Sequence, residues 1–441
     1  MKYVIIGNSA AGVGAVEGIR AAEAASAAEA ASKIGKQSEI TIITNEAHHT
    51  YSRPLISYLL LGKVTEETMK YRGDNFYIDN NVTLLSSVNV TKIDADKKQI
   101  ALSDGKNIPY DKLLVAAGSS PFTPPFEGLD TVKDKFTFMS LDDARLLDEA
   151  LTRKNKPNVL IIGAGLIGLK CAEGIEKRVS KITVVDLAPR ILSSILDEEG
   201  AALVQAHIEK QCAGWLTGIE FKLESSVKKF DVNKAVFENG EVIDFDILVL
   251  AVGVRPNTSL LKGIVDIDRG IIVNDKSETS AKDIYAAGDC TQTLDVSSGQ
   301  SKIMALLPNA YMQGECAGIN MAANGTSGKC FDKAIPMNAI GFFGLHMITA
   351  GNYTGEAYTK CDAAKDGGIN YKKLFYSDNK LNGYILIGNV EKAGIYTSLI
   401  RERTPLDSID FDLVCDKPGL MAFTREDRMV KLSGVKKDVC T

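Results

Sequence analysis

Residues 159–186, VLIIGAGLIGLKCAEGIEKRVSKITVVD, decide the fold because they join a strand, a glycine turn, a helix and a second strand. Four apolar residues, Val159 to Ile162, run into Gly163, Gly165 and Gly168, a G-x-G-x-x-G spacing where a strand ends and a helix begins. The first glycine permits a tight turn, the second lets backbone N–H groups approach a pyrophosphate, and the third lets helix and strand pack closely. The stretch therefore predicts a dinucleotide site at a helix N-terminus.

The residues next to these glycines complete the predicted site. Leu166 and Ile167 lie between the second and third glycines and belong to the same binding turn. Asp186 follows the strand Ile182 to Val185, and a carboxylate there can accept both hydroxyls of an adenosine ribose. Its charge would repel a 2′-phosphate, so Asp186 favours NAD over NADP. The alternative is an ordinary βαβ crossover that carries three glycines without binding a nucleotide.

The N-terminus repeats this architecture. Residues 3–6 form an apolar strand, residues 7–12 (GNSAAG) form the turn, and a helix follows. Ser9 replaces the second glycine, and a small residue still permits close approach of a phosphate. The chain therefore holds either two dinucleotides, or one dinucleotide and a turn that binds none.

Length and charge limit the class of protein. A chain of 441 residues exceeds one typical core, so two or three domains are expected. The formal net charge of −5 argues against a general affinity for nucleic acid or an anionic membrane. The longest apolar run, Val159 to Leu169, is interrupted by glycines and is too short to span a bilayer. Met1-Lys2 leads directly into a strand without a signal segment, so we expect a cytoplasmic protein.

Neither the cysteines nor the histidines have a metal-binding spacing. The eight cysteines include no C-x-x-C, and in a cytosolic chain most are expected to be buried small hydrophobes. The four histidines supply no zinc ligand spacing, and His48-His49 is interpreted as a loop pair. Iron–sulfur clusters need grouped cysteines, so the chain is expected to bind no metal of its own.

An alanine-rich helix is expected after the first turn. Residues 21–26 and 27–32 are the same hexamer, AAEAAS, and alanine is the best helix former. With few bulky residues, a helix from Gly12 to Ile34 is expected to be extended, about 34 Å long and largely solvated. A neutral surface insertion is favoured over a docking role.

Later strand ends suggest how the domains are arranged. Residues 246–251 form a strand that closes in Gly253, and residues 284–287 form a strand that leads to Gly288 and Asp289, a candidate hydroxyl acceptor. The predicted class is α/β, with two Rossmann-like dinucleotide-binding domains and a C-terminal α+β domain. Residues 1–140 and 270–330 would form the first domain, residues 141–269 the second, and residues 331–441 the third domain and a tail.

The ordered motifs resemble a known family. GNSAAG (7–12), YSRPLIS (51–57), LLVAAGSSP (113–121), GAGLIG (163–168), VLAVGVRPN (249–257) and IYAAGDC (284–290) are similar to those of the two-dinucleotide flavoproteins related to glutathione reductase. The closest resemblance is to the branch with rubredoxin reductases, ferredoxin reductases and the flavin part of bacterial nitrite reductases. This resemblance implies FAD on the first Rossmann unit and NADH on the second.

The same resemblance implies a set of FAD-binding residues. The FAD pyrophosphate would lie on the first turn, at Gly7, Ser9, Ala10, Ala11 and Gly12. The flavin would lie on Arg53 and Pro54 of the YSRPLIS segment and on Ala117 and Gly118 of the LLVAAGSSP segment. The ribityl chain would lie on Gly288 and Asp289 of the IYAAGDC segment, and the adenosine ribose on Glu46, after the second strand.

Two residues depart from the family pattern. Arg53 stands where disulfide-reducing, peroxidase and oxidase relatives carry a redox cysteine, and thiol–disulfide chemistry requires a thiolate. Cys290, beside Asp289, is interpreted as a packed residue at a helix start. Lys170 stands where many relatives have a glutamate near the nicotinamide. A cation in the first turn opposes the helix dipole, so Lys170 is expected to face solvent or a neighbour.

The expected activity follows from the flavin. FAD accepts a hydride as a pair and releases electrons singly, so no general acid, base or nucleophile is needed. The leading hypothesis is an FAD-dependent NADH oxidoreductase that exchanges electrons with a small iron–sulfur protein, rubredoxin or ferredoxin. The alternatives are an electron-transfer subunit docked in a larger metalloenzyme, which uses the alanine-rich helix and the C-terminal tail as contacts, and an NADH oxidase. Homo-oligomer formation and the direction of electron flow stay open.

Overall fold

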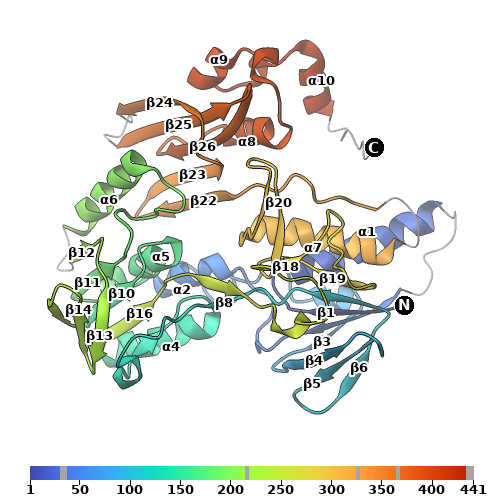
Figure 1. Cartoon of the computed structure of the whole chain (residues 1–441), viewed down its shortest axis with the longest axis horizontal. Helices are drawn as coiled ribbons and strands as arrows, with labels where there is room; N and C mark the ends of the chain where they lie inside the picture. Colours follow the sequence, from blue (N-terminus) through green and yellow to red (C-terminus); the bar gives the residue numbers. More distant parts are fainter. Residues whose placement is uncertain (30–36, 214–217, 324–327, 364–367, 434–441) are drawn as a thin grey trace.

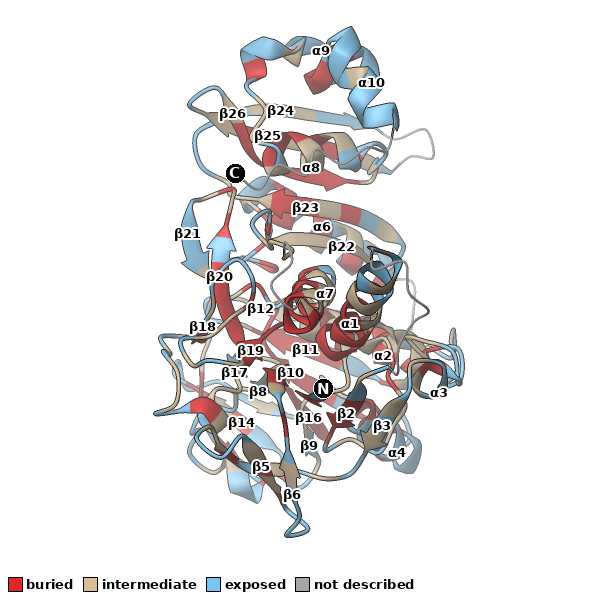
Figure 2. Ribbon diagram, turned by 90° about the vertical axis from the view of Figure 1, so that its right-hand side faces the viewer, coloured by how far each residue is buried: buried red, intermediate tan, exposed pale blue. Residues whose placement is uncertain are grey.

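The computed structural model describes residues 1–29, 37–213, 218–323, 328–363 and 368–433. Figure 1 shows two parallel sheets side by side and an antiparallel sheet above them. Figure 2 shows that the buried residues concentrate in these sheets and in the helices that cover them. The predicted class, α/β with two Rossmann-like domains and a C-terminal α+β domain, is confirmed.

The first parallel sheet is built around the N-terminal strand. Alternate residues of this strand face opposite layers, because Tyr3 and Ile5 pack on helices whereas Val4 and Ile6 pack on a small antiparallel sheet. The strand order is β19 (Ile284–Ala286), β7 (Lys112–Val115), β1 (Lys2–Ile6), β2 (Glu39–Ile43) and β3 (Val82–Leu85). The helices are α1 (Ala10–Glu29) and α7 (Leu307–Ala322), and the small sheet is β4 (Val90–Asp94), β5 (Gln99–Leu102) and β6 (Asn107–Pro109).

The second parallel sheet has the same arrangement. Val159 and Ile161 of its central strand pack on helices, and Leu160 and Ile162 pack on a three-stranded antiparallel sheet. The strand order is β12 (Gly218–Lys222), β11 (Lys181–Val185), β10 (Asn158–Ile162), β16 (Ile247–Leu250) and β9 (Lys135–Phe136). The helices are α4 (Leu141–Arg153), α5 (Leu166–Ile175) and α6 (Glu198–Cys212), and the small sheet is β13 (Val227–Asp231), β14 (Lys234–Phe237) and β15 (Val242–Asp244).

The connections between the two sheets run side by side. β8 (Ser119–Pro121) leaves the first sheet, β17 (Val254–Pro256) returns to it, and the two pair antiparallel. β9 lies before residue 141, the predicted start of the second domain, yet pairs with β16 of that domain's sheet. The remaining elements of these two regions are η1 (Arg53–Leu55), α2 (Ile56–Leu60), α3 (Phe76–Asp79), η2 (Leu129–Thr131), η3 (Glu176–Arg178), η4 (Ser259–Leu261), β18 (Ile271–Ile272), β20 (Thr291–Asp295) and β21 (Gln300–Lys302).

The C-terminal region is an antiparallel sheet with helices on one face. Tyr384 and Leu386 of its central strand pack toward these helices, whereas Ile385 and Ile387 join the core that contains the second parallel sheet. The strand order is β22 (Met337–Phe342), β23 (Leu345–Gly351), β26 (Lys380–Ile387), β25 (Ile369–Ser377) and β24 (Glu356–Ala363). The helices are α8 (Ala393–Arg401), η5 (Leu406–Ser408), α9 (Phe411–Asp416), η6 (Leu420–Ala422) and α10 (Arg425–Ser433).

Helices α1 and α7 pack with their backbones in contact. A Cβ on Gly314 would come within 2.7 Å of the carbonyl carbon and Cα of Ala11, and one on Gly318 within 2.9 Å of the Cα of Ala15. Gly14 of α1 likewise lies against α7, where a Cβ would be 3.0 Å from the backbone nitrogen of Glu315. Glycine is therefore required on both helices to allow this approach.

The alanine-rich helix differs in part from its prediction. Its first half is buried, from Ala10 to Val16, because it packs on α7, so the expectation of a largely solvated helix is wrong there. Residues 21–28 are partly or fully exposed, as expected. The last described residue of the helix is Glu29, and residues 30–34 of the predicted helix lie outside the described residues.

One hydrophobic core joins all three regions. It contains Tyr51, Ile56 and Leu60 from the first region, together with residues of α4, α5, α6 and the inner face of the C-terminal sheet. The segment that the family resemblance places at the flavin is therefore packed into the second and third regions rather than standing alone.

Candidate dinucleotide sites

The first glycine turn leaves free backbone N–H groups at its helix end. Gly7 has a φ of +118°, and a Cβ there would overlap the carbonyl group of Ala116. The backbone N–H groups of Ala10, Ala11 and Gly12 have no acceptor among the described residues. Since the first N–H groups of a helix lack intrahelical partners and carry partial positive charge, this end of α1 fits a phosphate.

The second glycine turn has the same geometry. Gly163 has a φ of +115°, and a Cβ on Gly168 would overlap its carbonyl oxygen. A Cβ on Gly165 would meet no atom within 4 Å, so this glycine borders open space. The N–H groups of Leu166 and Ile167 have no acceptor among the described residues. The open glycine and the free donors fit a pyrophosphate, as the spacing predicts.

Asp186 lies beside this second turn. Its Oδ2 accepts from the backbone N–H of Ala164 at 2.6 Å, and its Oδ1 accepts from the N–H of Ala188 at 2.8 Å. The side chain is half-buried at the carboxyl end of β11. These two bonds hold the carboxylate in a fixed orientation next to the glycines. Its contact with an adenosine ribose stays a prediction.

The equivalent position in the first domain is Thr44 and not Glu46. Ile6 pairs with Ile43 in the first sheet, as Ile162 pairs with Val185 in the second. The residue directly after the paired strand is Thr44 in one domain and Asp186 in the other. Thr44 is therefore a candidate ribose ligand that reading the sequence missed, and the internal register of the two sheets is the signal that identifies it.

Glu46 instead binds Arg53, the residue that the family resemblance places at the redox-cysteine position. Its carboxylate forms an ion pair with Arg53 and accepts from the Tyr51 hydroxyl at 2.9 Å. Arg53 also donates to the carbonyl oxygen of Met139 at 3.2 Å, and Tyr51 accepts from the N–H of Leu141 at 3.0 Å. These contacts attach the YSRPLIS segment to the start of α4. The ribose role of Glu46 and the flavin role of Arg53 stay predictions.

Four of the other predicted flavin residues follow the carboxyl ends of β7 and β19, namely Ala117, Gly118, Gly288 and Asp289. Asp289 accepts from the Ser119 hydroxyl at 3.4 Å, and burial raises the pKa of this carboxyl, opposed by the Ser119 hydrogen bond and by the charge of Arg53. Gly118 has a φ of +64° and borders open space, and Gly288 donates to Gln313 Oε1 at 2.8 Å. Ala117 next to Gly118 is half-buried, whereas Pro54 is exposed.

Two buried polar atoms near the first turn lack partners among the described residues. They are His49 Nε2 and Thr50 Oγ1. The Tyr77 hydroxyl connects Thr50 to the turn, because it bonds Asn8 at 2.9 Å and accepts from the N–H of Thr50 at 3.1 Å. The centres of the His49 and Tyr77 rings are 4.9 Å apart. The sequence indicated only a loop pair, His48-His49, whereas in the structure His49 and Thr50 border the candidate site. Together with the free N–H groups at the start of α1, these unpaired atoms fit a bound dinucleotide.

Lys170 faces neighbouring elements rather than solvent. Its side chain is 12% exposed and forms an ion pair with Glu173. Its ammonium lies 4.4 Å from the centre of the Tyr58 ring. Gly253, the last predicted residue of the second site, is exposed, has a φ of +105° and borders open space at the start of β17.

The described cysteines do not form a redox pair. The seven described cysteines form no disulfide, and the YSRPLIS segment contains no thiol. Cys290 is fully buried, and burial raises its pKa to about 11. It precedes β20 and a hairpin, so its interpretation as a helix-start residue is wrong, although packing was correctly expected. The described residues also contain no group of three possible metal ligands.

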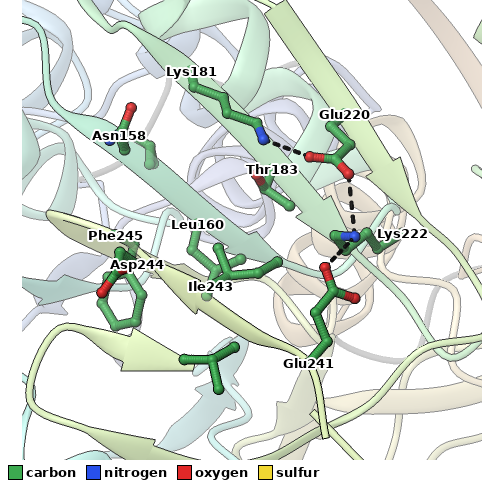
Figure 3. Close-up of a pocket in the computed structure, with 12 residues that line it drawn as sticks. Asn158, Leu160, Lys181, Thr183, Glu220, Lys222, Glu241, Ile243, Asp244 and Phe245 are labelled. Carbon is green, nitrogen blue, oxygen red and sulfur yellow. Dashed lines mark ion pairs between the residues drawn. The ribbon is translucent and has the colours of Figure 1, made fainter. Parts of the chain in front are cut away.

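A separate cavity of about 380 Å³ lies along β10, β11, β12 and β15 (Figure 3). Four of its five charged residues pair with one another: Lys181 with Glu220 at 2.6 Å, and Lys222 with Glu220 at 3.1 Å and Glu241 at 2.7 Å. The fifth, Asp244, pairs with Lys234 at 4.0 Å, outside the lining. The cavity reaches the first residues of β10 and β11, away from the carboxyl ends that bind nucleotides. Because these charges are compensated, we assign no ligand to this cavity.

Comparisons with known proteins agree with this geometry. Residues 1–314 match the family described as pyridine nucleotide-disulphide oxidoreductase, and residues 336–404 match the rubredoxin NAD+ reductase C-terminal domain. The chain is 32% identical to subunit epsilon of an NADH-dependent phenylglyoxylate dehydrogenase from Aromatoleum evansii, with 92% of each chain covered. It is 30% identical to an NADH oxidase from Methanocaldococcus jannaschii, with 98% of this chain and 100% of that protein covered.

A solved structure shows the same fold at lower identity. The putidaredoxin reductase–putidaredoxin complex superimposes with a TM-score of 0.81 at 21% identity, covering 98% of this chain and 99% of that one. No helix among the described residues is long and apolar enough to cross a membrane. The predicted resemblance is confirmed: the chain belongs to the pyridine nucleotide-disulphide oxidoreductase family and is an NAD(P)H-dependent flavin oxidoreductase with a rubredoxin reductase-type C-terminal domain.

Proposed function

We propose that this protein is an FAD-dependent NADH oxidoreductase that exchanges single electrons with a small iron–sulfur protein of the rubredoxin or ferredoxin class. One observation carries the proposal. The chain has two glycine turns with free N–H groups at the following helix end, at Gly7 and Gly163, while the segment that would hold a redox cysteine holds Arg53, paired with Glu46. Without a thiol in that segment, electrons from a bound flavin would pass to an external acceptor rather than to a protein disulfide.

The residues divide into two binding sets. The free N–H groups of Ala10, Ala11 and Gly12 would hold the FAD pyrophosphate, and Thr44 and Asp289 would accept from hydroxyls of the same cofactor. The turn at Gly165 would hold the NADH pyrophosphate, and Asp186 its adenosine ribose. When bound, FAD accepts a hydride and releases electrons one at a time.

Arg53 would fix the flavin-side segment. Its contact with Glu46 joins residues 51–57 to the segment after β2, and its contact with the carbonyl oxygen of Met139 joins them to the start of α4. A planar guanidinium with several donors suits this bridging position better than an ammonium would. Arg53 would therefore hold the segment in place through an ion pair and a hydrogen bond, and it would take no part in covalent redox chemistry.

The acceptor class is supported by the C-terminal region. Its match to the rubredoxin NAD+ reductase C-terminal domain extends over residues 336–404. A soluble iron–sulfur protein takes one electron at a time, which a flavin can supply and a nicotinamide cannot supply readily. The same chemistry is reversible, so a low-potential donor would drive electrons from the iron–sulfur protein to NAD.

A second candidate is an electron-transfer subunit of a larger metalloenzyme. It is favoured by the 32% identity to a protein named as a dehydrogenase subunit, over nearly the full length of both chains. A third candidate, an NADH oxidase, is favoured by the relative of that name. The second and third candidates would place NADH and flavin in the same two sites as the leading proposal. They differ from it only in the electron acceptor.

Anaerobic spectroscopy tests the proposal. The purified protein should show the visible absorbance of an oxidised flavin, and NADH should bleach it. Stopped-flow mixing of the reduced protein with rubredoxin, ferredoxin or oxygen then compares the acceptors. Absence of flavin, or no bleaching by NADH, would reject the proposal. Fastest reoxidation by oxygen would support the oxidase, and co-purification with a metalloenzyme partner that is lost on deletion of residues 21–32 would support the subunit.

A further inference from the structure

A buried ion pair on helix α5 contacts all three regions of the chain. Lys170 and Glu173 are one turn apart, and their side chains are 12% and 8% exposed. Helix α5 begins at the second glycine turn, so the pair lies within two turns of the predicted pyrophosphate site. Lys170 is the fifth residue of α5, beyond the first turn, where the helix dipole has little effect. A buried ammonium there is stabilised by its partners, and several of these lie outside the helix.

Those contacts reach the C-terminal sheet first. Lys170 Nζ donates to the carbonyl oxygen of Gly341 at 3.3 Å, and Glu173 Oε1 accepts from the N–H of Phe343 at 2.9 Å. Gly341 is in β22, and Phe343 is in the turn that leads to β23. From the other side, His207 of α6 bonds the carbonyl oxygen of Phe343 at 3.0 Å. The pair therefore fixes this turn against α5.

The same pair reaches the flavin-side helix α2. The Lys170 ammonium lies 4.4 Å from the centre of the Tyr58 ring, within the range of a cation–π interaction. One turn further along α5, a Cβ on Gly174 would be 3.1 Å from the carbonyl oxygen of Ser57, so α2 and α5 approach closely. Helix α2 continues directly from Arg53 and Pro54. A single helix contact thus joins the nicotinamide-side turn to the flavin-side segment.

Loss of one partner would leave the other buried and unpaired. Breaking a buried ion pair is more damaging than replacing both charges, because an uncompensated charge remains in the protein. Hydride transfer also depends steeply on the distance and angle between its two reactants, and a misplacement of about 1 Å can cost about 100-fold in rate. A pair that fixes α5 on α2 is therefore in a position to control this geometry.

We propose that Lys170 and Glu173 are positioning residues that hold the NAD-binding helix α5 in register with the flavin-side helix α2 and with the β22–β23 turn. The proposal rests on the function proposed above and deepens it. It assigns Lys170, which replaces the family's glutamate, to alignment of the hydride donor and acceptor rather than to nucleotide affinity.

The test is anaerobic stopped-flow reduction of the FAD-loaded protein by NADH. The Lys170→Met variant and the charge-free Lys170→Met/Glu173→Gln variant should lose about 10- to 100-fold in the limiting rate of flavin reduction. Their NADH dissociation constant and oxidised flavin spectrum should stay close to wild type. Lys170→Arg keeps a cation with several donors and should recover most of the rate.

The Lys181→Met variant is the matched control, because it removes a lysine from an exposed ion pair with Glu220 in the same sheet (Figure 3). Its limiting rate should equal that of wild type. If the charge-free double variant reduces its flavin at the wild-type rate, or if Lys181→Met loses the same factor, the positioning role is overturned. If wild-type protein itself is not bleached by NADH, the proposed function fails instead.

Discussion

Replacement of Gly314 by alanine should weaken FAD binding and destabilise the first domain, although alanine is the better helix former. The added Cβ would lie 2.7 Å from both the carbonyl carbon and the Cα of Ala11 and would overlap its carbonyl oxygen. All three atoms belong to the backbone and cannot rotate away. Helix α7 must therefore move from α1 at the residue that is predicted to hold the FAD pyrophosphate.

The size of the effect follows from two opposing terms. Overpacking a well-packed contact costs about 1–3 kcal/mol, and contact with three backbone atoms of Ala11 places this site at the upper end. Alanine returns about 1 kcal/mol of helix propensity. The net loss is about 2 kcal/mol, equivalent to about 4–8 °C in Tm for a unit of 150–250 residues. If the shift of α1 falls fully on the cofactor site, FAD affinity drops at least about tenfold.

Thermal unfolding and FAD titration of the apoprotein measure both effects. Gly318→Ala makes a similar overlap one turn further from the cofactor turn, so it should lose stability and retain more FAD affinity. Gly394→Ala, at the start of α8, is the matched control, because its Cβ would meet no atom within 4 Å. It should be neutral or stabilise by up to about 1 kcal/mol. A Gly314→Ala variant with the Tm and FAD affinity of wild type would refute the close approach of α1 and α7.

Three further substitutions or treatments test the individual residues. Asp186→Ser should lower kcat/KM for NADH by about 10- to 100-fold, because charge-assisted hydrogen bonds are lost, and it should reduce discrimination against NADPH. If steady-state assays give an unchanged ratio of kcat/KM for NADH over NADPH, Asp186 does not belong to the ribose site. Because burial raises the pKa of Asp289 in the folded protein, its protonated form is favoured there, and apoprotein stability should fall as pH rises through that pKa. Asp289→Asn should abolish this fall in thermal melts from about pH 4 to about pH 8, and persistence of the slope would assign it to another group. Iodoacetamide should label exposed Cys361 and spare buried Cys171 and Cys290, because burial raises the pKa of both buried thiols. Labelling of Cys290 in the native protein, read by mass spectrometry, would contradict its burial.

Features set by local sequence were predictable, and contacts between distant segments were not. The strand β10 and the turn at Gly163 follow from an apolar run that ends in correctly spaced glycines, and the structure has both. The burial of the first half of α1 was missed, because its partner α7 begins about 300 residues later. The placement of Lys170 was equally hidden, since its acceptor Gly341 is 171 residues away.

The candidate site shows the same division. The glycine spacing and the position of Asp186 could be read directly, because both lie within one βαβ unit. The pairing of Glu46 with Arg53 is also local, at seven residues, but charge alone did not distinguish it from a ribose contact. Only the register of β1 on β2 indicates that Thr44, and not Glu46, occupies the position of Asp186.

The contact between α1 and α7 has a consequence for synthesis of the chain. Ala10 leaves the ribosome about 300 residues before Leu307, an interval of about 15–60 s at about 5–20 residues per second. During that time the nascent first domain lacks both its last strand, β19, and the helix that covers α1. The face of α1 that α7 later covers consists of Gly14, Gly18 and alanines, so it offers little apolar surface to neighbouring nascent chains. Because α1 and α7 pack through their backbones rather than through large apolar side chains, α1 exposes few apolar side chains before α7 is synthesised. The incomplete first domain therefore has little tendency to aggregate during synthesis.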